Sequence, residues 1–134
     1  MATFNKINAF VADLANKGHN LGSDQLSVVL TDTAPTVGST SFAGEISYAN
    51  FNGANPNYLT ITSSTQTSGT YKLIMANLVM TASGTVPQFR YIGIKNITAS
   101  KVIAWYDYGS EVNMATGDTF TVNFDGTNGL IQLA

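Results

Sequence analysis

The sequence predicts a mainly β protein, an antiparallel, jelly-roll-like β-sandwich of about seven or eight strands with one N-terminal α-helix. Three observations predict this class. Apolar stretches of strand length recur along the chain and are separated by turn-forming Gly, Pro, Asn and Asp. Helical periodicity is confined to the first 17 residues. The chain has 134 residues and is 44% hydrophobic, which is enough for one domain with a real core.

The N-terminal segment carries apolar side chains at helical spacing. Thr3 is placed to cap the start of this helix, and Gly18 occupies the position of a left-handed residue after its end. Such a short helix is marginal alone in water, so its apolar stripe must pack on something. It either covers its own sheet or lies on a neighbouring subunit as a docking arm. The stripe consists of Phe4, Ile7, Phe10, Val11 and Leu14.

Residues 1–22 therefore form a helix and linker, and residues 23–134 form the sandwich. Alternation at residues 26–30 predicts a half-buried strand. Residues 31–57 are rich in turns, hold one short strand at 45–48, and form a mostly exposed loop suited to contacts with other chains. The further predicted strands are 58–62, 70–82 with a bulge or bend at 76–77, 89–94, 101–106, 119–124 and 130–133.

Two details of strand pairing follow from these segments. Residues 119–124 and 130–133 are expected to form a terminal hairpin across the turn at 125–129. Residues 71–76 and 102–106 combine high β propensity with little charge, and would promote aggregation at an open edge. We therefore expect them to be central strands or covered edges.

Groups that perform chemistry are scarce. His19 is the only histidine and there is no cysteine, so we expect a structural His19 and neither metal nor cofactor. The loop 125–129 offers one carboxylate, which indicates a turn and not a calcium site. Nothing brings Glu45 and Glu111 together as a glycosidase pair. Asn96-Ile97-Thr98 matches a glycosylation acceptor, but without an export signal we expect the match to be chance.

One aromatic segment is a candidate glycan contact. Alternation places Trp105 and Asp107 on one face of a strand, with Tyr106 and Tyr108 on the other. A ring beside a carboxylate is typical of sugar sites, so Trp105, Asp107 and Tyr108 are candidate glycan-contacting residues. The alternative is that Trp105 packs in the core and the tyrosines cover it.

The charge pattern favours protein partners. Only 10% of residues are charged and the formal net charge is −2, so nothing in the chain could track a phosphate backbone. Nucleic acid is therefore not an expected partner. No apolar run is long enough to span a bilayer, and the first six residues lack the apolar core of a secretory signal, so we expect no membrane association and no export. Surfaces with little charge tend to associate.

One set of segments is distinctive when taken together, namely residues 4–11, 19–24, 26–35, 67–73, 89–91, 105–110, 117–122 and 124–125. These segments resemble a group of small virion-associated proteins of tailed bacteriophages. The resemblance covers most of the chain and is weakest at 36–57.

This resemblance implies a non-enzymatic capsid decoration or cement protein on the capsid exterior, made in the host cytoplasm. Such a protein clamps neighbouring subunits of the major capsid protein, contacts copies of itself and is commonly an oligomer, often a trimer. Two alternatives stay open: a tail, head–tail adaptor or fibre-base component, and a carbohydrate-binding attachment module. The candidate protein contacts are Phe4, Ile7, Val11, Leu14, Pro35 and Phe51.

Overall fold

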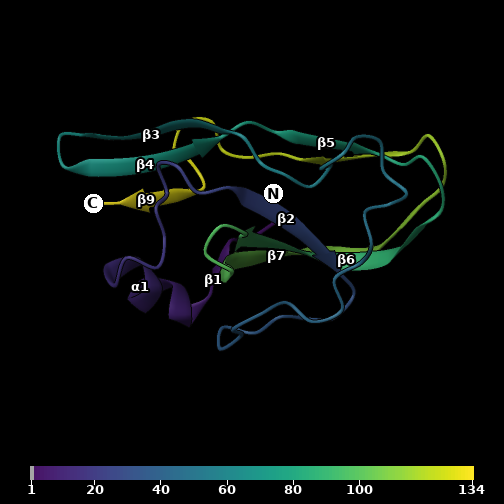
Figure 1. The fold of residues 1–134 in the computed structure, drawn as a ribbon, viewed down its shortest axis with the longest axis horizontal. Coiled ribbons are helices and arrows are strands. Elements are labelled where there is room, and N and C mark those ends of the chain that lie inside the picture. Colours follow the sequence, from purple (N-terminus) through teal and green to yellow (C-terminus); the bar gives the residue numbers. More distant parts are fainter. Residues whose placement is uncertain (1) are drawn as a thin grey trace.

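The strands lie in two antiparallel layers that face each other (Figure 1). The computed structural model describes residues 2–134. One layer has the order β1-β7-β6-β2, and the other combines a β3-β4-β9 sheet with a β5-β8 pair. The predicted sandwich with one N-terminal helix is confirmed, with nine strands in the described part of the chain. Their bounds are β1 Asn5–Lys6, β2 Leu26–Thr31, β3 Ile61–Thr67, β4 Thr70–Met75, β5 Leu78–Thr81, β6 Val86–Asn96, β7 Lys101–Met114, β8 Thr119–Val122 and β9 Ile131–Leu133.

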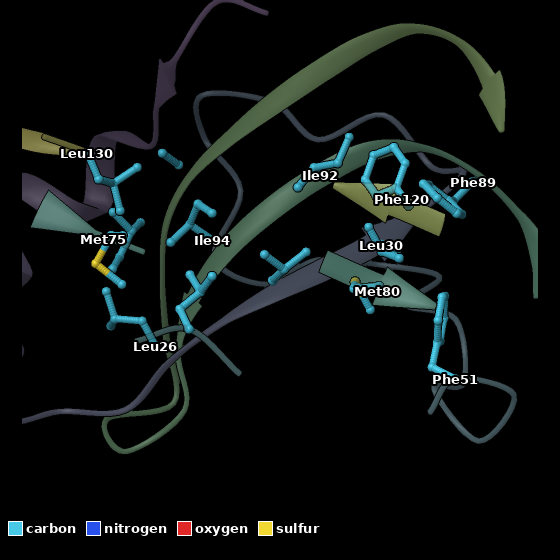
Figure 2. Packing of buried hydrophobic residues seen from close by; sticks show 14 of the residues in the cluster. Leu26, Leu30, Phe51, Met75, Met80, Phe89, Ile92, Ile94, Phe120 and Leu130 are labelled. Carbon is cyan, nitrogen blue, oxygen red and sulfur yellow. The ribbon is translucent and has the colours of Figure 1, made fainter. Parts of the chain in front are cut away.

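The core fills the space between the two layers (Figure 2). Leu26, Leu30 and Ile94 project from one layer and meet Met75 and Met80 from the other. All five are almost completely buried. Alternate residues of a strand point to opposite faces. The residues of β4 and β8 that alternate with the buried ones therefore point away from the core.

The second layer is built from two long bent segments instead of a terminal hairpin. β4 pairs with β9 and β5 pairs with β8. The break between β4 and β5 falls at Ala76–Asn77, as predicted, and the Phe124 amide donates to Asn77 Oδ1 at 2.7 Å. The predicted hairpin between 119–124 and 130–133 is therefore wrong. Its turn at 125–129 was identified correctly, but a turn does not determine which distant strands pair with its flanks.

Helix α1 (Asn8–Ala15) is shorter than predicted because the chain before it is extended. Asn5 and Lys6 form β1, which pairs with Trp105 and Ala104 of β7. Ile7 occupies the N-cap position without a side-chain cap, so the predicted cap by Thr3 is wrong. At eight residues, α1 is too short to cross a bilayer, and the described residues contain no other α-helix.

The end of α1 also differs from the prediction. Lys17 adopts the left-handed conformation, with φ of 63°, in place of Gly18. Gly18 is needed for another reason, since a Cβ there would lie 2.7 Å from the carbonyl oxygen of Asp13. Lys101 Nζ on β7 lies 3.3 Å from Asp13 Oδ1, so α1 packs against its own chain.

Strand β2 is buried along its whole length, so the prediction of a half-buried strand is wrong. Its second face is covered by residues 32–46, which we call the strap. Figure 1 shows the strap below the β1-β7-β6-β2 layer, on the side away from β3 and β4. The Phe42 ring lies against Gly93, the β6 residue that pairs with Val29 of β2. The predicted strand at 45–48 is reduced to one isolated bridge between Thr31 and Glu45.

Candidate functional site

A buried polar cluster joins the linker after α1 to β6. His19 is 7% exposed and Asn96 is fully buried. The Asn96 side-chain amide donates to His19 Nδ1 at 3.0 Å and to Asp24 Oδ2 at 2.7 Å, while its carbonyl oxygen accepts from the Ala99 amide at 3.0 Å. These contacts fix which side-chain atom of Asn96 is the nitrogen. His19 Nδ1 must therefore accept, and the proton of the neutral ring sits on Nε2.

This arrangement keeps His19 neutral and Asp24 ionised. Burial lowers the pKa of His19, and the nearby Asp13 and Asp24 carboxylates only partly oppose it. Hydrogen bonds from Asn96 and from the Asn20 amide hold the pKa of Asp24 below its usual range. His19 Nε2 is buried and bonds to nothing in the described structure. The ring is therefore held in position through the contact of Nδ1 with Asn96.

A cleft of about 550 Å³ opens beside this cluster, between α1 with its linker and the β4–β9 end of the second layer. Ser64 Oγ and the Tyr71 hydroxyl lie 2.8 Å apart on its wall. The lining contains no carboxylate, and the cleft offers apolar walls together with hydrogen-bonding side chains. Its lining residues are Leu14, Lys17, His19, Asn20, Leu21, Gly22, Ser64, Tyr71 and Leu133.

The candidate glycan residues are divided between two faces of β7. Trp105 is half-buried, and it shares the outward face with Asp107. Arg90 Nε and an outer guanidinium nitrogen donate to the two Asp107 oxygens at 2.8 and 3.0 Å, and this pair holds the pKa of Asp107 below its usual range. Tyr108 lies on the other face, with its ring 5.5 Å from that of Phe120. The three side chains therefore do not converge on one sugar-sized site.

The outer face of the second layer is broad, polar and almost uncharged. The side chains on this face point away from the core, because along each strand they alternate with buried residues such as Leu73, Met75 and Met80. Part of this face forms a hollow with a volume of about 540 Å³. Only Lys72 is charged, and its Nζ donates to the Thr127 carbonyl at 3.2 Å. We call this set the hydroxyl face: Ser63, Thr65, Thr67, Thr70, Lys72, Ile74, Val79, Thr81, Thr119, Thr121 and Gln132.

The residues predicted to contact other proteins occupy different environments. Ile7 is fully buried and Phe51 is 4% exposed, with a backbone bridge to Ala82. Phe4 packs edge-on against Tyr106, with ring centroids 5.8 Å apart. Leu14 and Pro35 are half-buried, whereas Val11 is 52% exposed on the open side of α1. Of the six, Val11 presents the most accessible apolar side chain.

The remaining sequence candidates are engaged in local structure. Asp125 Oδ1 accepts from the amides of Thr127 and Asn128 at 2.8 and 2.9 Å, which lowers the pKa of this carboxyl as a turn residue. Glu45 accepts from the Tyr48 hydroxyl at 2.9 Å, and Glu111 lies on β7. The Asn96 amide of the acceptor sequence is buried, so this fold does not present it for glycosylation.

Comparisons with known proteins supply no relative. No family model, no curated protein and no solved structure matches this chain. Among residues 2–134, no three His, Cys, Asp or Glu side chains are grouped as metal ligands.

Neither the hydroxyl face nor the strap was predicted from the sequence. The hydroxyl face had a local signal, namely Ser, Thr and Gln filling residues 62–67 and Thr alternating at 119–121. The contact between Phe42 and Gly93 had none, because it joins residues far apart in the chain.

Proposed function

We propose that this chain is a non-enzymatic structural protein of a bacteriophage virion that decorates the capsid and bridges neighbouring subunits of the major capsid protein. The hydroxyl face is the observation that supports this proposal best. It extends across both sheets of the second layer, and only Lys72 on it is charged. Burying such a face against protein desolvates hydroxyl groups that can find new partners, and it avoids the larger cost of burying unpaired charges.

Binding on a shell would rest on many weak contacts. Each copy needs only modest affinity for one subunit, because simultaneous contacts to neighbouring subunits raise the effective concentration. Val79 is 59% exposed and pairs with Thr121 near the middle of the β5–β8 pair, where it provides an apolar anchor. The major capsid protein is proposed as the partner because of the resemblance to small virion proteins of tailed bacteriophages.

Copy number in purified particles tests the proposal directly. Quantitative mass spectrometry against the major capsid protein should give a ratio near one or a simple fraction such as one third. Particles that lack this protein should break at a lower temperature than complete ones and should be less resistant to low salt. A ratio of a few per cent would move the protein to the tail, and complete absence from particles would overturn a virion role.

A surface variant tests the face itself. Val79→Asp combined with Thr121→Asp places two charges on the exposed cross-strand pair, and we expect binding to stripped particles to weaken on the order of tenfold or more. Thr116→Asp, in the exposed turn between β7 and β8, is the matched control. Unchanged binding by the folded double variant would exclude this face as the contact.

A further inference from the structure

Strand β3 forms an open sheet edge, unlike the other long strands. β4 and β7 lie inside their sheets, as predicted from their composition. The free side of β2 is covered, since its backbone bonds to residues 46 and 57–59 and to the Tyr48 hydroxyl. The part of β7 beyond β1 is bulged between its pairings at Asp107 and Val112, and it carries Glu111. Bulges and charges are the features that normally block edge pairing.

β3 has fewer of these protections. Its sequence, Ile-Thr-Ser-Ser-Thr-Gln-Thr, contains no charge and no proline over seven residues. One irregularity lies at its start, between Ile61 and Ser63, and residues 63–67 then pair regularly with β4. No backbone group of residues 63–67 bonds to any segment other than β4 within the described residues. A regular, uncharged and unpaired strand is a template for another strand.

The turn after β3 shows which backbone groups are free. Ser68 and Gly69 have φ of 52° and 82°, typical of a two-residue hairpin turn, so Thr67 and Thr70 form a hydrogen-bonded pair. Hydrogen-bonded pairs recur at every second residue in an antiparallel ladder. The backbone groups of Thr65 therefore point toward β4, and those of Ser64 and Gln66 point outward from the sheet.

We propose that β3 pairs antiparallel with β3 of a second copy of this chain, across a two-fold axis at Thr65. Ser64 then faces Gln66 of the second copy, and Gln66 faces its Ser64. Each of these two pairs exchanges two backbone hydrogen bonds. With the axis at Thr65, the pairing involves only residues 63–67, which are in regular register with β4. An axis at Ser64 would also involve Thr62, which lies at the irregularity between Ile61 and Ser63.

The absence of charge on β3 is what favours a second copy as the occupant. In a two-fold pair the same surface of both copies forms the interface, and a residue near the axis lies close to the same residue of the second copy. A charge near the axis would therefore be repelled by its own counterpart. Thr opposite Thr and Ser opposite Gln carry no such repulsion, and cross-strand Thr pairs are favourable. The pairing would join two β3-β4-β9 sheets and place two hydroxyl faces side by side. It does not depend on a virion location.

Cysteine cross-linking of the purified protein tests both the pairing and its axis. The natural chain has no cysteine, so Thr65→Cys introduces a single thiol. In the proposed pair, the two Thr65 residues form a non-hydrogen-bonded pair with Cα atoms about 4.5 Å apart, within disulfide range. We expect rapid oxidation to a covalent dimer. Thr116→Cys, an exposed thiol in the β7–β8 turn, should stay largely monomeric.

Charge provides the second test. Thr65→Lys places two ammonium groups opposite each other, and we expect a dimer dissociation constant about tenfold or more above that of Thr65→Val or Thr116→Lys in sedimentation. Cross-linking at Ser64→Cys but not Thr65→Cys would overturn the proposed axis. A natural chain that stays monomeric up to about 0.1 mM, with Thr65→Cys no faster than Thr116→Cys, would overturn the pairing. Neither failure affects the virion proposal, which is tested on particles.

Discussion

The imidazole of His19 accepts a hydrogen bond from the side-chain amide of Asn96 at 3.0 Å, and this contact helps to tie the linker after α1 to the end of β6. The same Asn96 nitrogen donates to Asp24 at 2.7 Å. Because Asn96 Nδ2 can only donate, a proton on His19 Nδ1 would place two donors against each other. The cluster is therefore compatible with neutral His19 and ionised Asp24.

The first prediction concerns pH. The pKa of His19 is lowered in the folded chain, mainly by burial, so the unfolded chain binds a proton more readily below about pH 6.5. The contribution of neutral His19 to the free energy of unfolding should therefore be complete above that pH, and it should decline as the pH falls below it. The lowered pKa of Asp24 adds a separate loss below about pH 4. Denaturant titrations at pH 7.5, 6.5, 5.5, 4.5, 3.5 and 2.5 would measure both phases.

His19→Gln separates these two phases. A glutamine oxygen can accept from Asn96 but does not titrate, so the variant should lose the decline near pH 6 and keep the one below pH 4. If the variant and the natural chain show the same pH dependence between 7.5 and 5.5, His19 is not the titrating group.

The second prediction concerns Asn96 itself. Asn96→Ala removes three hydrogen bonds and leaves the Ala99 amide and the Asp24 carboxylate with fewer partners. We expect a loss of about 2–4 kcal/mol in the free energy of unfolding. Asn77→Ala is the control, because Asn77 is exposed and its one bond to the Phe124 amide should be worth about 1 kcal/mol. Equal losses in the two variants would contradict the importance of the buried cluster.

The sequence predicted the features that depend on local periodicity. Alternation located β2, and the change of phase near Ala76–Asn77 located the break between β4 and β5. Alternation also placed Trp105 and Asp107 on a face opposite Tyr108. All of these follow from the two-residue repeat of a strand, which the sequence displays directly.

Features that depend on distant residues were not predictable in this way. The second face of β2, which carries Ser27, Val29 and Thr31, was predicted to be exposed, because nothing in residues 26–30 shows that the strap covers it. The pairing of Asp107 with Arg90 requires the β6–β7 register, which the sequence does not state. The pairing of β8 with β5 was missed for the same reason. The turn at 125–129 has residues that favour a hairpin, but packing between distant segments determined which strands pair with the segments on either side of it.

The third prediction concerns the β3–β4 turn. Ser68 has φ of 52°, a conformation that costs most residues energy and that asparagine adopts more readily. Asn followed by Gly is also the preferred pair for this turn type. Ser68→Asn should therefore raise the free energy of unfolding by about 0.5 kcal/mol. Ser110→Asn is the control, since Ser110 is exposed and has no left-handed backbone. A lower melting temperature for Ser68→Asn than for this control would contradict the turn assignment.

The fourth prediction tests the strap through Gly93. A Cβ at Gly93 would lie 2.5 Å from the Phe42 ring, so Gly93→Ala must push the ring away from the sheet. Gly93 does not have a positive φ, and the expected loss of about 1–3 kcal/mol therefore reports crowding and not backbone strain. Gly126→Ala should be nearly neutral, because its Cβ would meet nothing within 4 Å.

A double-mutant cycle identifies Phe42 as the cause of that loss. Phe42→Ala alone should cost about 1–3 kcal/mol through lost burial, since its ring is half-buried. In the double variant the new methyl group occupies space that the ring has vacated. The combined loss should therefore be smaller than the sum of the two single losses by about 1 kcal/mol or more. Strict additivity in urea unfolding would mean that Phe42 does not pack on Gly93, and that the strap leaves this face of the sheet uncovered.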